Sequence, residues 1–188
     1  RGLGDVYKRQ VREEKQAVSP VRKAVMSCAD NTKLLPGSDF YDAQERVHSY
    51  LLHTREEQWL YNFRRAAGLP VGGASPMTGW DSPEGLLRGH STGHYLSALA
   101  LCYQTSGDEE ILKKAVYMVD SLGECQEAFG RKEGYHKGFL SAYSEEQFDL
   151  LEKYTSYPKI WAPYYTLHKI LAGLIDLYLS LIHISEPT

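Results

Sequence analysis

The chain has 188 residues and a formal net charge of −3 at neutral pH. This balance lacks the basic excess of proteins that bind a phosphate backbone, so nucleic acid is excluded as a partner. The three cysteines, Cys28, Cys102 and Cys125, form no metal-site spacing, and we interpret them as small core residues. We therefore expect this chain itself to bind no metal.

The first and last ten residues, Arg1–Gln10 and Leu179–Thr188, can be encoded by DNA strings that are reverse complements of each other. A match over both whole segments is too long to arise by chance, and the string resembles the adapter of transposase-based sequencing libraries. We therefore interpret residues 1–10 and 179–188 as translated adapter and residues 11–178 as a natural segment of a longer protein. The apolar run at Leu174–Ile184 is too short and too mixed to span a membrane, so no membrane partner is expected.

Periodic apolar residues and terminal signals predict six helices, and Val18–Met26 suggests one or two short strands before them. Ser38 is expected to cap the first helix, whereas Ser144 with Gln147 forms a capping-box pattern before the fifth. Pro163 occupies a first-turn position of the last helix. The predicted helices span residues 39–52, 56–67, 90–105, 108–129, 145–153 and 163–178.

The links between these helices alternate in length. Ser106-Gly107 is a tight link, whereas residues 71–89 and 154–162 form long ones. This alternation fits an α/α toroid, in which inner and outer helices pair and the long loops line a pocket at one end. We therefore expect an all-α fold.

Two histidines open the third predicted helix. His90 and His94 are four residues apart, which places both rings on one face of a helix. The sequence between them lacks the glutamate of a zinc-protease motif, and two histidines alone make a poor metal site. They could serve as capping or core residues, or donate hydrogen bonds to a polar ligand. Gly89 and Gly93 favour the ligand, because a missing side chain lets a substrate or another backbone come close.

Further aromatic and polar residues surround two helix starts. His168 follows Tyr165 on the last predicted helix, where aromatic packing between helices is the alternative role. Trp80 lies in the long loop before His90, together with Asp81 and Glu84. Such a carboxylate pair is weak support for acid–base chemistry, because glycosidases need a defined separation of the two groups in space.

Four segments of the chain carry a family resemblance. They read LLPGSDFYDAQ at Leu34–Gln44, GWDSPEGLLRGHSTGHYLSALAL at Gly79–Leu101, GFLSAYSEEQFDLLE at Gly138–Glu152 and WAPYYTLHKILAGLIDLY at Trp161–Tyr178. In this order they resemble the β-L-arabinofuranosidase superfamily, glycoside hydrolase families 127 and 146, over nearly all of the natural segment.

The resemblance implies a partial (α/α)6 barrel, followed in the longer protein by β-sandwich domains. It also implies hydrolysis of terminal β-L-arabinofuranosyl groups from plant glycans, with retention, by a cysteine bound to zinc. The zinc ligands of the family are three cysteines and a glutamate, and a separate glutamate is the acid/base. No cysteine of this chain lies in a matching context, so no catalytic or metal residue is carried over, and the zinc is expected only in the parent enzyme.

The resemblance carries over the sugar-facing residues. His90 and His94 within RGHxxGHYL and His168 within YYTLHK are expected to donate hydrogen bonds to arabinose hydroxyls, and Trp80 or Tyr165 to shape the pocket wall. Because the catalytic groups are expected elsewhere, we expect this fragment alone to be inactive.

Two alternatives remain open. The chain could be part of another enzyme on the same toroid, an unsaturated uronyl hydrolase or a sugar epimerase. A uronate pocket would need a cation near the histidines, for which Arg88 and Lys169 are the candidates. It could also be a non-catalytic glycan-binding member of the family.

Overall fold

A computed structural model of the chain describes residues 32–185, and within this range the fold is all-α, as predicted. The predicted strands at Val18–Met26 lie outside the described residues. The helices are α2 (Asp39–His53), α3 (Glu56–Ala67), the 3-10 helix η1 (Gly79–Asp81), α4 (His90–Ser106), α5 (Glu109–Gly130), α6 (Glu146–Glu152) and α7 (Pro163–Ser185).

Helix ends follow local signals in most places. The Ser38 hydroxyl accepts a hydrogen bond from the Tyr41 amide and caps α2, as expected. The capping box predicted at Ser144 is wrong, because the Gln147 amide donates to the backbone carbonyl of Ser144 and no side-chain cap is present. The Glu145 carboxylate instead accepts hydrogen bonds from the His136 backbone and imidazole, at 2.8 and 2.6 Å. Helix α7 begins at Pro163 and continues past the predicted end at residue 178.

Helices α4 and α7 form the most extensive helix pair in the described part of the chain. Their backbones touch where Gly93 of α4 faces the carbonyl of Lys169 and where Gly173 of α7 faces the carbonyl of Gly93. A Cβ at either glycine would overlap these backbone atoms, so only glycine permits this crossing. The Ser97 hydroxyl donates to the Asp176 carboxylate at 2.6 Å and adds a polar contact along the same pair.

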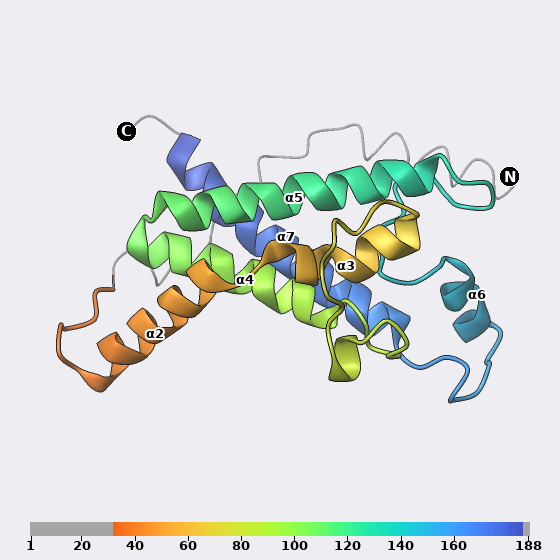
Figure 1. Cartoon of the computed structure of the whole chain (residues 1–188), viewed down its shortest axis with the longest axis horizontal. Helices are drawn as coiled ribbons and strands as arrows, with labels where there is room; N and C mark the ends of the chain where they lie inside the picture. The colour runs from red at the N-terminus through yellow and green to blue at the C-terminus, as the bar shows by residue number, and fades with distance from the viewer. Residues whose placement is uncertain (1–31, 186–188) are drawn as a thin grey trace, which may run out of the picture.

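Helix α5 packs across α4 and α3 and completes the core (Figure 1). One stripe of α5 is buried at helical spacing, which is the pattern of a helix with one apolar face. This stripe comprises Ile111, Ala115, Met118, Leu122, Cys125 and Phe129. Figure 1 shows α2 and α6 at opposite ends of this central group of helices.

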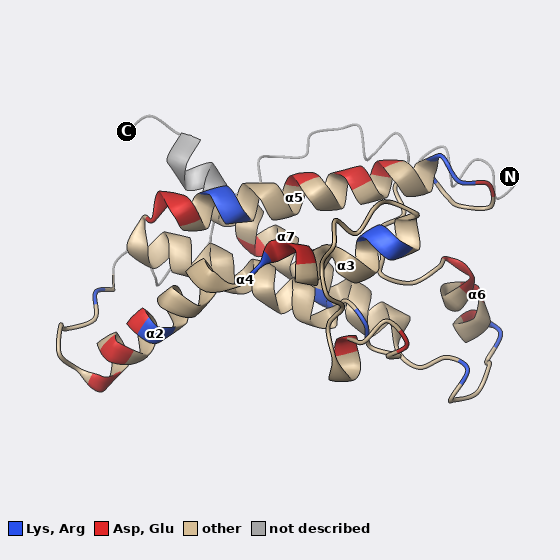
Figure 2. Ribbon diagram, in the orientation of Figure 1, with Lys and Arg blue, Asp and Glu red and all other residues tan. Residues whose placement is uncertain are grey.

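Charged residues are concentrated away from α4, which carries no Lys, Arg, Asp or Glu (Figure 2). On α7, the large apolar side chains of Leu171, Ile175 and Tyr178 are exposed along one stripe. Such a stripe is typical of a helix face that packs against another element. Within residues 32–185, no helix is both long and apolar enough to cross a membrane.

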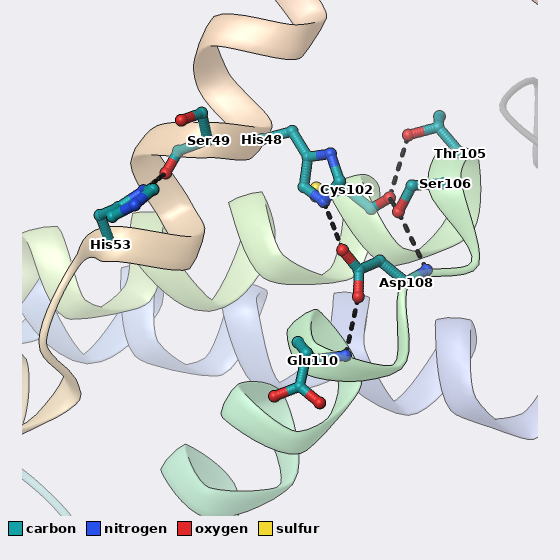
Figure 3. Close-up of polar contacts among 8 residues, drawn as sticks. All are labelled: His48, Ser49, His53, Cys102, Thr105, Ser106, Asp108 and Glu110. Atoms are coloured by element: carbon teal, nitrogen blue, oxygen red, sulfur yellow. Dashed lines mark hydrogen bonds and ion pairs between the residues drawn. The ribbon is translucent and has the colours of Figure 1, made fainter.

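A histidine–carboxylate pair fastens α2 to the turn between α4 and α5 (Figure 3). The imidazole Nε2 of His48 lies 2.7 Å from the Asp108 carboxylate. The same carboxylate accepts from the Glu110 amide and caps α5. The hydrogen bond from the Glu110 backbone amide, followed by the one from the His48 side chain, lowers the pKa of Asp108 below its ordinary value. Asp108 therefore joins α2 to the start of α5 through one side chain.

The crossing of α4 and α7 predicts opposite effects of one substitution at two helical glycines. We expect Gly93→Ala to destabilise the chain by about 1–3 kcal/mol or more, because the new methyl group forces the helix backbones apart. Gly123→Ala on α5, where nothing lies within 4 Å of the added Cβ, should stabilise it by about 0.5–1 kcal/mol. Urea unfolding followed by circular dichroism measures both, and equal effects would contradict the backbone contact.

Candidate functional site

The candidate site forms where the loop from η1 enters α4. Gly89, the residue before α4, has a φ of 92° and provides no side-chain cap of its own. The buried carboxylate of Asp81 takes over this role by accepting a hydrogen bond from the Gly89 amide at 2.6 Å. A negative charge here also favours the positive end of the helix dipole.

Asp81 also orients His90. The imidazole Nδ1 of His90 lies 3.1 Å from the Asp81 carboxylate and 2.8 Å from the carbonyl oxygen of Leu87. Because both neighbours are acceptors, Nδ1 carries a proton. In the neutral ring, Nε2 is then left as an acceptor, 3.3 Å from the Ser91 hydroxyl. The ring is therefore held in one orientation and one tautomer.

Four of the five candidate residues form a ring cluster around His90. The ring centroids of Trp80, His94 and Tyr165 lie 6.2, 6.2 and 6.3 Å from that of His90. The imidazoles of His90 and His94 are perpendicular. Trp80 is 68% exposed and Tyr165 45% exposed, whereas the His90 side chain is only 12% exposed. The cluster therefore has a buried, oriented centre and an accessible rim.

His168 is placed differently. It is exposed on α7, three residues after Tyr165, so it lies on the same side of the helix as that tyrosine. No ring contact or hydrogen bond joins it to His90 or His94 in the part of the chain that the structure describes. The structure thus brings together two of the three predicted imidazoles.

The glycines beside the histidines serve packing. A Cβ at Gly89 would lie 2.7 Å from the Ala142 side chain and 3.1 Å from the Phe63 ring. Gly93 admits the backbone of α7 at Lys169. Of the two roles considered for these glycines, close approach of other protein groups is the one that the contacts support.

The described residues do not fit a zinc site. No three His, Cys, Asp or Glu side chains within residues 32–185 lie close enough to hold a metal ion. Cys125 is buried in the core, where desolvation raises the pKa of its thiol to about 11, and burial likewise raises the pKa of Cys102. Zinc binds the thiolate, which such surroundings disfavour. Cys28 lies outside the described residues.

The loop carboxylates are not arranged as an acid/base pair. Both oxygens of Asp81 are engaged by Gly89 and His90. Glu84 is exposed and accepts two hydrogen bonds from Arg65, each of 3.2 Å. Neither carboxylate is therefore available at the ring cluster. The orienting role of Asp81 was not predictable from the sequence, because its partners include a backbone amide.

These contacts predict that the two loop carboxylates differ in their effect on stability. Asp81→Ala leaves the buried Gly89 amide without an acceptor and should cost about 1–3 kcal/mol. Glu84→Ala removes only an exposed ion pair and should change the free energy of unfolding by less than about 0.5 kcal/mol. Denaturant titration of both variants tests this, and a neutral Asp81→Ala would contradict the assigned role.

Comparison with known proteins assigns the chain to a family. The family model for the β-L-arabinofuranosidase GH127 catalytic domain matches residues 31–181, which include all helices described above up to the last part of α7. A search of the curated proteins gives no match. The matched range contains the complete ring cluster and His168. The chain therefore belongs to the β-L-arabinofuranosidase family defined by the glycoside hydrolase family 127 catalytic domain.

Proposed function

We propose that this chain supplies the sugar-binding part of a retaining glycoside hydrolase that releases terminal β-L-arabinofuranose from plant glycans. The observation that supports the proposal is the ring cluster of Trp80, His90, His94 and Tyr165, which lies within the matched catalytic domain. Its members come from three elements, η1, α4 and α7, so the fold and not a single motif assembles it.

The cluster suits a neutral sugar. His90 offers a fixed acceptor at Nε2, and not the donor expected from the sequence, because its proton on Nδ1 faces Asp81 and Leu87. The exposed His94 adds a ring nitrogen that can donate or accept. The exposed indole of Trp80 provides a flat apolar surface of the kind that can cover one face of a sugar ring. Helix α4 carries no charged residue near these groups. Hydroxyl groups, which both donate and accept, match this set better than a carboxylate does.

Hydrolysis with retention proceeds in two displacements at the anomeric carbon. The glycosidic bond breaks as a nucleophile bonds to that carbon, and water then replaces the nucleophile. Because Asp81 and Glu84 are both engaged in other contacts, we assign the nucleophile and the acid/base to residues outside the described range. The zinc site implied by the resemblance is likewise assigned to no residue of this range.

Of the alternative functions, the uronate-processing enzymes require a free cation beside the histidines. The guanidinium of Arg88 instead donates to the carbonyl oxygens of Ala142 and Gly85 and lies 4.3 Å from the centre of the Tyr143 ring. The ammonium of Lys169 lies 4.9 Å from the centre of the Tyr165 ring. These positions favour a neutral sugar over a uronate, and galacturonate binding serves as the direct comparison below.

Sugar binding should depend on His94. We expect His94→Ala to weaken binding of methyl β-L-arabinofuranoside at least about tenfold, because a hydrogen bond to a sugar hydroxyl is lost. His53→Ala is the matched control, since His53 is also exposed on a helix but bonds only the Ser49 carbonyl. Isothermal titration calorimetry measures both. Unchanged affinity in His94→Ala, or tighter binding of galacturonate than of the arabinofuranoside, would refute the assignment.

Because the proposal assigns the catalytic groups to residues outside the described range, we expect the chain alone to be inactive. The purified chain should release no nitrophenol from 4-nitrophenyl β-L-arabinofuranoside above the rate in buffer, because the described residues offer no nucleophile at the cluster. Absorbance at the nitrophenolate band follows the reaction. Turnover that is abolished by Asp81→Asn would show that the chain carries its own catalytic carboxylate.

A further inference from the structure

Three large aromatic side chains are exposed on the loop between α6 and α7. Tyr154, Tyr157 and Trp161 are 95%, 69% and 49% exposed. The isoleucine that separates the last two, Ile160, is only 2% exposed, so the loop buries its aliphatic side chain and leaves its aromatic ones in solvent. Exposed apolar groups of this size are typical of a surface that binds a ligand or another molecule.

Tyr154 occupies a backbone position that disfavours its side chain. Its φ is 56°, and it is the one non-glycine residue with a positive φ in the described part of the chain. Its amide donates to the carbonyl of Leu151 at the end of α6. The left-handed residues that end α3 and α4 are both glycines, Gly68 and Gly107. Glycine avoids the clash between Cβ and the backbone that a bulky residue meets in this conformation.

No contact within the described chain offsets this unfavourable conformation. The Tyr154 side chain is almost fully exposed and forms no hydrogen bond, ion pair or ring contact with another described residue. Glycine would end α6 equally well, so the tyrosine is not explained by folding. Unfavourable backbone conformations concentrate at sites that bind ligands. Tyr154 is therefore expected to contact a molecule other than this chain.

Tyr157 and Trp161 form a pair of exposed rings in the same loop. Their ring centroids are 6.1 Å apart, and the ring planes are inclined at 76°. The backbone between them begins with a turn, closed by the hydrogen bond from the Lys159 amide to the Ser156 carbonyl at 3.2 Å. The Tyr157 hydroxyl and the Trp161 indole N–H bond no described residue, so both polar groups are available. Tyr154 lies three residues before Tyr157, so their Cα atoms are at most about 11 Å apart.

These exposed groups suit the rings of a neutral glycan. An aromatic face can cover the C–H groups of a sugar ring, while a phenol hydroxyl or an indole N–H bonds the hydroxyls at its edge. A membrane surface is matched less well, because insertion among lipid chains favours exposed aliphatic groups and Ile160 is turned into the protein. The family to which the chain belongs likewise acts on carbohydrate.

We propose that Tyr154, Tyr157 and Trp161 form an aromatic platform that binds a neutral glycan chain. The choice of a glycan as the ligand rests on the proposed function. The platform shares no residue with the ring cluster, so attachment of a glycan to it does not require an occupied ring cluster.

The indole N–H signals of the three tryptophans separate the two sites in nuclear magnetic resonance of the full chain. Trp161 reports the platform and Trp80 the ring cluster, whereas Trp59, which stacks on Tyr95, is the internal reference. During titration with xylohexaose, a neutral oligosaccharide, we expect the Trp161 signal to shift and saturate while the Trp59 signal stays fixed. Vesicles of phosphatidylcholine and phosphatidylserine test the alternative of a membrane surface.

One substitution separates a binding role of Tyr154 from a folding role. Tyr154→Gly relieves the unfavourable φ, so we expect a higher urea midpoint together with binding of xylohexaose that is at least about threefold weaker. Tyr157→Ala, which retains the Trp161 signal, should weaken binding at least about fivefold.

The matched control is Tyr50→Gly. Tyr50 is also an exposed tyrosine, but it lies within α2, at the end of the molecule opposite α6 (Figure 1). Because glycine disfavours a helix interior, this control should lower the urea midpoint, and it should leave the affinity for xylohexaose unchanged.

Each result supports or overturns the platform. A Trp161 shift that weakens in Tyr154→Gly while the midpoint rises supports it. A lower midpoint in Tyr154→Gly, an unchanged affinity of that variant, or a Trp161 response to vesicles and not to xylohexaose overturns it. If Trp161 does not respond to xylohexaose but Trp80 responds to methyl β-L-arabinofuranoside, the platform is overturned and the proposed function stands. The reverse pattern supports the platform and contradicts the proposed function.

Discussion

The backbone contact between α4 and α7 determines the geometry of the whole candidate site. Gly93 lets the carbonyl of Lys169 approach the axis of α4, and Gly173 does the same from the other helix. Because Gly93 lies between His90 and His94, this contact point coincides with the histidines. Tyr165 then lies one turn before Lys169 and reaches the ring of His90. A wider crossing would leave the two imidazoles on α4 but would separate them from the aromatic side chain of α7.

Asp81 connects the start of α4 to α3. Through its carbonyl it is bound to α3 by Asn62, and through its carboxylate it holds the Gly89 amide and faces His90. A buried carboxylate is costly unless its oxygens are paired, and here a backbone amide and an imidazole provide the pairing. The loop from η1 to α4 is therefore fixed at Asp81, although it contains little regular structure.

The helices were predictable because their signals are local. Ser38, the apolar spacing of α5 and Pro163 each lie in or next to the helix that they define. The observed helices differ from the predicted ones mainly in their end residues. Ser144 failed as a cap because the Gln147 amide bonds the backbone carbonyl of Ser144 and not its hydroxyl. Of the site, the spacing of His90 and His94 was visible in the sequence. The bond from Asn62 to the Asp81 carbonyl was not, because it joins residues that lie 19 apart in the chain.

The polar groups of the ring cluster suit sugar binding, and in the proposed function another part of the protein supplies the catalytic groups. The Nδ1 atom of His90 donates to protein acceptors, so Nε2 can recognise a hydroxyl. The described residues of the cluster include no unengaged carboxylate or thiol that could bond to an anomeric carbon. Cys102 and Cys125, the described thiols, are both disfavoured as thiolates by burial, which raises their pKa. In the proposed function, a group that forms the glycosyl bond would approach from the open side of the cluster, where Trp80 and Tyr165 are exposed.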